Sequence, residues 1–343
     1  MGAEGYGAAA ARTWRLGALQ GLEGTALRSE LVRYATLAPS SHNTQCWKFG
    51  FEDQAIVIVP DYSRRCPVVD PDDHHVFVSL GCAAENLVQA ALVHGFNAEA
   101  TFDSARDALR IALTPTAAAR SALFDAIPQR QCTRAEYDGK PLTGEELRLL
   151  ERASSGTGGT SVQLLLLTDR AAIEKVLEFV VQGNAVQLKD PAFIGELKSW
   201  IRFNTRDAVR LGDGLSAASS GNPSVPAWLG RMVLGFLLTP KAENDKVTRQ
   251  VRSSAGIAVF VGAAADKANW IEVGRAYERF ALQAAALGIR HAHLNQPVEV
   301  ASLRSSFANA LGLPGRRPDL VLRFGRGPTL PPSLRRPVKA VLI

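Results

Sequence analysis

Apolar side chains recur at helical spacing in several stretches of the chain. In residues 25–37, Leu27 and Leu31 begin an apolar stripe, and the pattern stops before Pro39, which disfavours a helical conformation in the preceding residue. Another such stretch ends at Gly95, a typical C-terminal cap. Helices are therefore predicted over residues 25–37, 79–94, 144–152, 169–200 with a break at Pro191, and 271–287.

Short apolar runs bounded by turn residues predict buried strands between these helices. The clearest is the sequence AIVIV. A different pattern occupies residues 213–226, DGLSAASSGNPSVP, which are polar and rich in glycine, serine and proline, as in functional lids and disordered loops. Strands are predicted at residues 55–59, 98–102, 109–113, 162–167, 256–262 and 318–324.

Two of the predicted helices carry the same small residues at a constant offset of 193 positions. Small side chains allow a helix to pack closely against a neighbour, and a glycine and a strand follow both helices. This repeat indicates duplication, so we expect two related lobes, residues 1–115 and 116–343, with a lid insertion near 184–246. The matching pairs are Gly81 and Gly274, Ala83 and Ala276, Glu85 and Glu278, Ala91 and Ala284, and Gly95 and Gly288.

Composition narrows the class of protein. With 343 residues, 46% hydrophobic and 21% charged, the chain suits a two-lobed globular enzyme. No apolar run reaches the length of a bilayer span, and the N-terminal residues contain no apolar signal core, so we expect a cytoplasmic protein without membrane contact. The four cysteines are widely spaced and form no CxxC pair, which favours reduced thiols over a disulfide framework or a zinc site. They are Cys46, Cys66, Cys82 and Cys132.

The net charge of +6 raises the question of nucleic-acid binding. No run of lysine and arginine with interleaved aromatic residues occurs, so a small ligand that carries phosphate explains the charge better. The chain also lacks GxGxxG, a Walker A loop, GxSxG and HExxH, which argues against the commonest dinucleotide, nucleotide and hydrolase sites.

Two histidine-containing segments are candidates for metal ligands. The sequence DPDDHH at residues 70–75 is more typical of a helix N-terminus and surface charge. His291 and His293 would point to one face of a strand, but no third ligand is evident. We therefore expect no metal site.

Polar groups cluster directly after the first predicted helix, in APSSHNTQCW at residues 38–47. The hydroxyls of Ser40 and Ser41 and the amides of Asn43 and Gln45 could meet the ring edge and ribityl chain of a flavin. From the residues alone, an ordinary polar helix end and turn explains them equally well.

This segment resembles the APSxxNxQPW motif of the nitroreductase family, with Cys46 in place of the proline. A second segment, RQCTR, resembles the family's RRSxR, with glutamine and cysteine at the second and third positions. Further along, SLRRP resembles the C-terminal phosphate-binding stretch, and the segment after residue 287 resembles the part that offers N–H groups to flavin N5. The resemblance implies a site for flavin mononucleotide (FMN) made by Pro39, Ser40, Ser41, Asn43, Gln45, Arg130, Gln131, Cys132, Arg134, Asn295, Gln296 and Arg335, with Arg130 and Arg335 on the phosphate.

The order of these motifs resembles the twin-domain, Acg-like branch of the family. The first lobe carries APSSHNTQ without RRSxR, and the second carries RQCTR without an Asn-x-Gln pair. The resemblance implies an α+β nitroreductase-like fold, two related lobes fused as an internal pseudo-dimer, with one FMN between them. The chain would then be a monomer or a weak homodimer.

The implied function is FMN-dependent reduction of nitroaromatics, quinones or similar small electrophiles with NAD(P)H. An alternative is a protein that stores or sequesters FMN under a closed lid. A flavin enzyme of another chemistry, such as an oxidase or dehalogenase, is a third possibility. No catalytic side chain is singled out, because the flavin supplies the chemistry.

Overall fold

The computed structural model describes residues 5–17, 21–156 and 161–343. Its α-helices are Tyr6–Thr13 (α1), Gly24–Thr36 (α2), His74–Val93 (α3), Ala122–Ala126 (α4), Gly144–Ser155 (α5), Arg170–Lys189 (α6), Pro191–Trp200 (α7), Thr205–Leu211 (α8), Ala227–Leu237 (α9), Pro240–Arg252 (α10), Lys267–Ala286 (α11), Gln296–Glu299 (α12) and Ala301–Ala310 (α13). Its strands are Trp47–Glu52 (β1), Ala55–Pro60 (β2), Phe96–Asp103 (β3), Ala108–Pro115 (β4), Gln163–Leu167 (β5), Ile201–Arg202 (β6), Leu215–Ser216 (β7), Gly256–Val261 (β8), Arg290–His293 (β9) and Leu320–Gly325 (β10). Short 3-10 helices cover Ser41–Asn43 (η1), Tyr62–Arg64 (η2), Ile127–Gln129 (η3), Ala218–Ser220 (η4) and Val338–Ala340 (η5).

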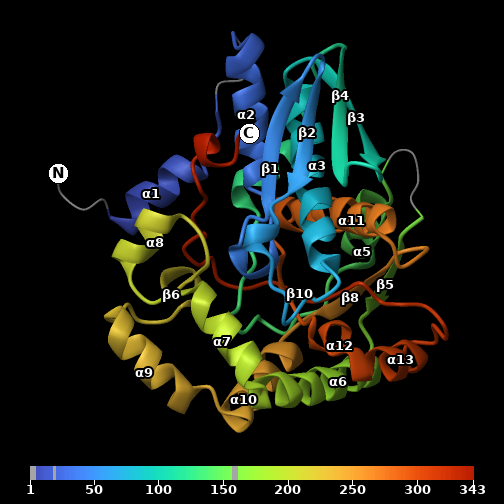
Figure 1. Cartoon of the computed structure of the whole chain (residues 1–343). Coiled ribbons are helices and arrows are strands. Elements are labelled where there is room, and N and C mark those ends of the chain that lie inside the picture. Colours follow the sequence, from blue (N-terminus) through green and yellow to red (C-terminus); the bar gives the residue numbers. More distant parts are fainter. Residues whose placement is uncertain (1–4, 18–20, 157–160) are drawn as a thin grey trace.

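Two antiparallel sheets of four strands have the same strand order. The first is β1-β2-β4-β3 and the second is β5-β8-β10-β9, so each strand of one sheet has a counterpart in the other (Figure 1). β8 is buried along its whole length, as expected of the continuous apolar run GIAVFV. Helices cover both sheets. The predicted α+β fold of two related lobes is confirmed.

The central helices α3 and α11 pack against each other around two glycines. Both helices have twenty residues and are offset by 193 positions, since 267 − 74 and 286 − 93 are both 193. A Cβ on Gly81 would lie 2.0 Å from the carbonyl oxygen of Ile271, and one on Gly274 would lie 2.0 Å from that of Val78. These two contacts are related by the same offset, so the helices cross with local twofold symmetry.

The lobes differ most between their first two strands. β1 and β2 are joined by a two-residue turn, whereas β5 and β8 are separated by everything from α6 to α10 (Figure 1). α6 and α10 pack Val176, Val180 and Val251 onto the side of the second sheet that faces away from α11. Residues 184–246 lie inside this longer segment, and their role as a lid insertion stays a prediction.

The C-terminal tail joins the two lobes. After β10 the chain returns to the first sheet, where the backbone N–H of Phe49 donates to Val341 (2.8 Å) and that of Ile343 donates to Phe49 (3.0 Å). The predicted division after residue 115 coincides with the end of β4, but the tail adds residues 341–343 to the edge of the first sheet. That residue 115 separates two folding units stays a prediction.

One apolar core runs through both lobes by way of α3 and α11. In the described part of the chain, α3 is the one helix long and apolar enough to cross a membrane, and 83% of that stretch is buried in the protein. Its apolar character is therefore explained by its central position. The four cysteines are free thiols, as predicted.

Candidate functional site

The loop after α2 has a strained backbone that its own hydrogen bonds hold in place. His42, Asn43 and Gln45 have φ angles of 49°, 55° and 55°, in the left-handed region that side chains other than glycine rarely adopt. The hydroxyl of Ser40 accepts a hydrogen bond from the backbone N–H of Gln45 at 2.9 Å. Pro39 and Ser41 are half-buried beside it. The predicted flavin loop is therefore a fixed turn.

The amides of Asn43 and Gln45 are fully used within the protein. Asn43 Nδ2 donates to the carbonyls of Gly214 (3.0 Å) and Leu334 (3.2 Å). Gln45 Nε2 donates to the carbonyl of Gly212 (2.8 Å), and its Oε1 accepts from the backbone N–H of Arg336 (2.8 Å). These side chains tie the insertion and the tail to the loop after α2.

Arg335 caps the C-terminal end of α2 with all of its donors. Each guanidinium nitrogen has acceptors at 2.7–3.1 Å, so no N–H remains for another partner. Burial lowers the pKa of Arg335 to about 9. The acceptors are the carbonyls of Thr36, Leu37, Ala38 and Leu334 and the side-chain oxygens of Asn43 and Ser333. The phosphate role of Arg335 stays a prediction, and it requires Arg335 to leave some of these partners.

Arg130 reaches the same helix end but keeps donors free. It is 4% exposed, and its Nη2 donates to the carbonyl of Leu37 at 3.1 Å. Its Nε lies 3.3 Å from Oε1 of Glu278, yet Nε and Nη1 are buried without a hydrogen-bond partner. Burial raises the pKa of Glu278 to about 7. A buried guanidinium with open donors is suited to an anionic ligand.

The other residues of the RQCTR segment differ in their contacts. Gln131 holds the tail, because its amide donates to the carbonyl of Leu330 and accepts from the N–H of the same residue. Cys132 is half-buried and its backbone forms a bridge with His291. Arg134 is exposed, and its guanidinium has no partner among the described residues.

Asn295 and Gln296 follow β9 in the second lobe. Asn295 Oδ1 accepts from the backbone N–H of Val321 at 3.0 Å, which fixes the turn. Gln296 Nε2 lies 3.5 Å from Oδ1 of Asn184 on α6, while its Oε1 is buried without a partner. The free polar atoms of the predicted set are therefore concentrated on Arg130, Arg134 and Gln296.

Several neutral histidines that were not predicted as site residues lie beside these groups. Burial lowers the pKa of His42 to about 4 and that of His293 to about 3, and the charge of Arg134 acts on both. Both rings nevertheless remain only half-buried. Tyr277 of α11 lies 3.0 Å from Nε2 of His291 and of His293, which leaves Nδ1 of His293 buried and unpartnered. Their alternation on a strand was visible in the sequence, but their partner on α11 was not.

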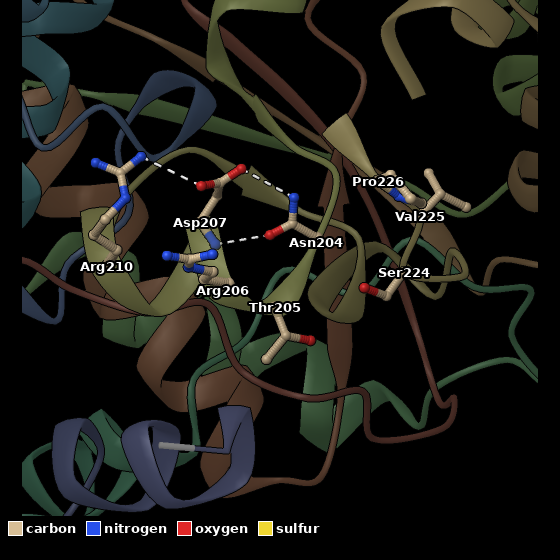
Figure 2. A pocket seen from close by; sticks show the side chains of 8 residues that line it. All are labelled: Asn204, Thr205, Arg206, Asp207, Arg210, Ser224, Val225 and Pro226. Carbon is tan, nitrogen blue, oxygen red and sulfur yellow. Dashed lines mark hydrogen bonds and ion pairs between the residues drawn. The ribbon is translucent and has the colours of Figure 1, made fainter. Parts of the chain in front are cut away.

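A broad hollow lies elsewhere, on the outer side of α8. Figure 2 shows the eight residues that line this space of about 570 Å³. Three of its polar side chains serve the helix: Asn204 accepts from the N–H of Asp207 at 2.8 Å, and Arg210 pairs with Asp207 at 3.3 Å. None of the predicted site residues lines this hollow, so it does not define the candidate site.

The chain is similar in sequence to several known proteins. No protein-family model matches it. It is 25% identical over 323 residues to "Putative NAD(P)H nitroreductase Rv3131" of Mycobacterium tuberculosis H37Rv, a match that covers 91% of this chain and 90% of the relative. It is 23% identical over 330 residues to "Putative NAD(P)H nitroreductase acg" of the same organism, with 90% and 93% covered. Over nine-tenths of its length the chain is thus similar to proteins named putative NAD(P)H nitroreductases, acg among them.

Solved structures of shorter nitroreductases are also similar. A nitroreductase with bound FMN from Desulfitobacterium hafniense covers 64% of this chain and 96% of its own, with 14% identity and a TM-score of 0.40. The FMN-dependent nitroreductase NfnB of Mycobacterium smegmatis, in complex with NADPH, covers 60% and 87%, with 14% identity and a TM-score of 0.38.

Proposed function

We propose that the chain is an FMN-dependent oxidoreductase that uses NAD(P)H to reduce a small electrophile such as a nitroaromatic or a quinone. The observation that carries this proposal is similarity over nine-tenths of the chain to proteins named NAD(P)H nitroreductases. The placement of the two motif segments supports it. Arg130 and the loop after α2 come from different lobes and meet at the carbonyl of Leu37.

The residues present fit the phosphate end of FMN. Arg130 offers Nε and Nη1, which are buried without hydrogen-bond partners, beside the C-terminal end of α2. A phosphate would satisfy both and offset the buried charge. Arg134 and Gln296 would face the polar ring edge. The flavin would supply two-electron transfer, and the neutral rings of His42 and His293 would border the acceptor, where each can donate or accept a hydrogen bond.

One flavin per chain is expected because the place equivalent to the FMN site is filled by protein. Glu85 is the counterpart of Glu278, and it pairs with Arg279 at 2.9 Å. Arg279 also donates to the carbonyls of Ala153 and Ser154 at the end of α5, much as Arg335 does at the end of α2. No phosphate could enter there without displacing Arg279. A cytoplasmic monomer is the simplest assembly, since both lobes are present in one chain.

The second candidate function is storage or sequestration of FMN. The observation that favours it is the attachment of the insertion to the first lobe. Asp213 is 7% exposed and pairs with Arg64 and with Arg202, whose Nη2 lies 2.7 Å away. A lid held in this way would keep a ring covered.

Anaerobic mixing with NADPH or NADH, followed at the flavin absorbance band, separates the two functions. The purified protein should carry one FMN per chain. If it is an oxidoreductase, NADPH or NADH should bleach the flavin absorbance within seconds. A flavin that stays oxidised indicates a storage protein. Failure to bind any FMN after reconstitution contradicts both, and two FMN per chain contradict the assignment of Arg279.

A further inference from the structure

A histidine at the start of α3 is buried without any hydrogen-bond partner for its ring. His75 is 5% exposed, and neither Nδ1 nor Nε2 makes a hydrogen bond. Buried imidazoles normally satisfy at least one ring nitrogen, because leaving a polar atom unpaired costs about 1–3 kcal/mol. The proposed oxidoreductase function does not use His75 as a ligand of the flavin. The unpaired ring therefore requires a partner of another kind.

Two further ligand groups lie beside this ring. One ligand atom each of Asp70, His74 and His75 fall within 4.8 Å of one another, and all three residues are buried. Asp70 is held firmly, since its Oδ2 accepts from the backbone N–H of His75 (2.9 Å) and of Val76 (3.3 Å). Its Oδ1 lies 3.9 Å from Nδ1 of His75. The sequence favours a helix-capping role for Asp70, and that role occupies Oδ2 alone.

His74 has the environment of a metal-binding histidine. Its Nε2 lies 3.0 Å from Oδ1 of Asp319, whose other oxygen accepts from the backbone N–H of Gly262. Histidines that bind metals commonly donate their second ring nitrogen to a carboxylate, which orients the ring. With Nε2 on Asp319, Nδ1 is the ring nitrogen of His74 that remains for an ion. Asp319 belongs to the second lobe, so the group spans both lobes.

The charge of this group also calls for a cation. Asp70 and Asp319 are 3% and 1% exposed, and no lysine or arginine within the described ranges lies at ion-pair distance from either. Arg316 and Arg317 act on Asp319 only from beyond ion-pair distance, so the two buried carboxylates keep a negative charge that is costly in a protein interior. A divalent cation would compensate it.

We propose that Asp70, His74 and His75 bind one divalent first-row transition-metal ion, such as Zn²⁺, and that Asp319 orients His74. Two nitrogen ligands and one oxygen ligand suit such an ion better than Mg²⁺ or Ca²⁺, which prefer oxygen. Ligands at about 2.1 Å from an ion lie about 3 to 4 Å apart. Oδ1 of Asp70 and Nδ1 of His75, 3.9 Å apart, are already in that range, and the group as a whole lies within 4.8 Å. The ion would hold the N-terminus of α3 to the preceding turn, independently of the flavin, and Asp319 would link this site to the residues beside β8 and β10.

Metal uptake by the full chain tests the site. After treatment with EDTA, equilibrium dialysis against Zn²⁺ with elemental analysis should give one tightly bound ion per chain, and Co²⁺ should give the visible absorption of a protein-bound ion. His75→Gln and Asp70→Asn should weaken Zn²⁺ binding at least about a hundredfold, and Asp319→Asn about 10- to 100-fold. The control is His94→Gln, which removes a half-buried histidine from the far end of α3 and should bind as wild type does.

Asp70→Asn keeps a side-chain oxygen for the helix N-terminus, so it decides the matter if His75→Gln does not fold. Zn²⁺ uptake that is the same in wild type and in Asp70→Asn would overturn the proposal. So would a wild-type chain that takes up neither ion, because His75 would then be satisfied by water or left unpaired. Thermal unfolding followed with and without Zn²⁺ should show full stabilisation of wild type and His94→Gln, a smaller effect on Asp319→Asn, and the least on His75→Gln and Asp70→Asn.

Discussion

Arg130 and Arg335 approach the same carbonyl, that of Leu37, yet their remaining donors give them different roles. All donors of Arg335 are bonded to protein oxygens, whereas two nitrogens of Arg130 are not. A bound phosphate therefore gains most from Arg130. Arg335 fixes the end of α2 and the loop that follows it, so in the proposed site it would affect the ligand indirectly.

Arg130→Ala should weaken retention of FMN by about 1.5–3 kcal/mol, or roughly ten- to a hundredfold, because a charge-assisted contact to phosphate is lost. Binding of riboflavin, which has no phosphate, should hardly change. Arg335→Ala should instead lower the Tm of the flavin-free protein and weaken both ligands alike. Arg231→Ala on α9, where the side chain is exposed, is the control. Equal weakening of FMN and riboflavin by Arg130→Ala would contradict its assignment to the phosphate.

Glu278 makes stability depend on pH near neutrality. Burial raises its pKa from 4.5 to about 7 in the folded protein, so the folded state holds a proton that the unfolded state has released. This stabilising contribution is complete below about pH 4.5 and is lost as the pH rises through 7. The difference in free energy of unfolding between wild type and Glu278→Gln should therefore fall by about 3 kcal/mol at most from pH 4.5 to 8. Denaturant titrations of both proteins measure this difference. If their free energies of unfolding change in parallel with pH, Glu278 is ionised throughout and the prediction is wrong.

At the scale of elements, the crossing of α3 and α11 depends on the absence of two side chains. Gly81→Ala would place a methyl group 2.0 Å from the carbonyl oxygen of Ile271, which the helices can relieve only by moving apart. Overpacking of this kind costs about 1–3 kcal/mol, and more where the backbone itself must shift. Chemical denaturation should show this loss. Gly195→Ala on α7, where nothing lies within 4 Å, should stabilise by about 0.5–1 kcal/mol. A neutral Gly81→Ala would mean that the crossing is not close-packed.

Much of this element structure was predictable, because the residues of α2, α3 and α11 and of all six predicted strands show helical periodicity or apolar runs. β1 was missed although Trp47 to Glu52 (WKFGFE) alternates apolar and other residues as a half-buried strand does. The segment was interpreted as the end of the loop after α2, and its pairing with β2 identifies it as a strand. α9 and α10 were missed, since no helix was predicted between residue 200 and residue 271. α3 begins at His74 rather than residue 79, because its polar first turn is stabilised by Asp70.

The sequence indicated which segments form the candidate site. It did not indicate which of their hydrogen-bond donors remain without a partner in the folded chain. Asn43 and Gln45 are bonded to residues about 170 positions away, and Arg335 to residues nearly 300 positions away. Sequence patterns indicate which side chains are polar, whereas only the folded chain shows which polar atoms remain unpaired. For the same reason the pairing of Tyr277 with His291 and His293 could not be foreseen.

At the scale of the whole molecule, the question is whether the insertion moves. Residues 213–226 were predicted as a lid, and their first part is tied down. Asp213 pairs with Arg64 and Arg202, and both of those guanidinium groups also stack near the ring of Trp200. Ser216 is bonded to Tyr6 of α1 at 2.8 Å. The later part, from residue 217, makes fewer bonds to the lobes, so any motion is expected there.

Reduction of the flavin by NADPH in three proteins decides between a mobile and a closed insertion. Asp213→Asn weakens the attachment to the first lobe by removing its charge, and deletion of residues 216–224 removes the covering segment itself. If the insertion opens freely, wild type is reduced within seconds and neither change accelerates it, since access to the ring does not limit the rate. If the ion pairs keep it closed, wild type reacts slowly, Asp213→Asn reacts faster, and the deletion reacts fastest. The FMN content of each protein is measured first, so that loss of flavin is not mistaken for loss of reactivity. A wild-type protein inert to NADPH and NADH, with a reactive deletion variant, would identify a closed flavin-holding protein and contradict the reductase function.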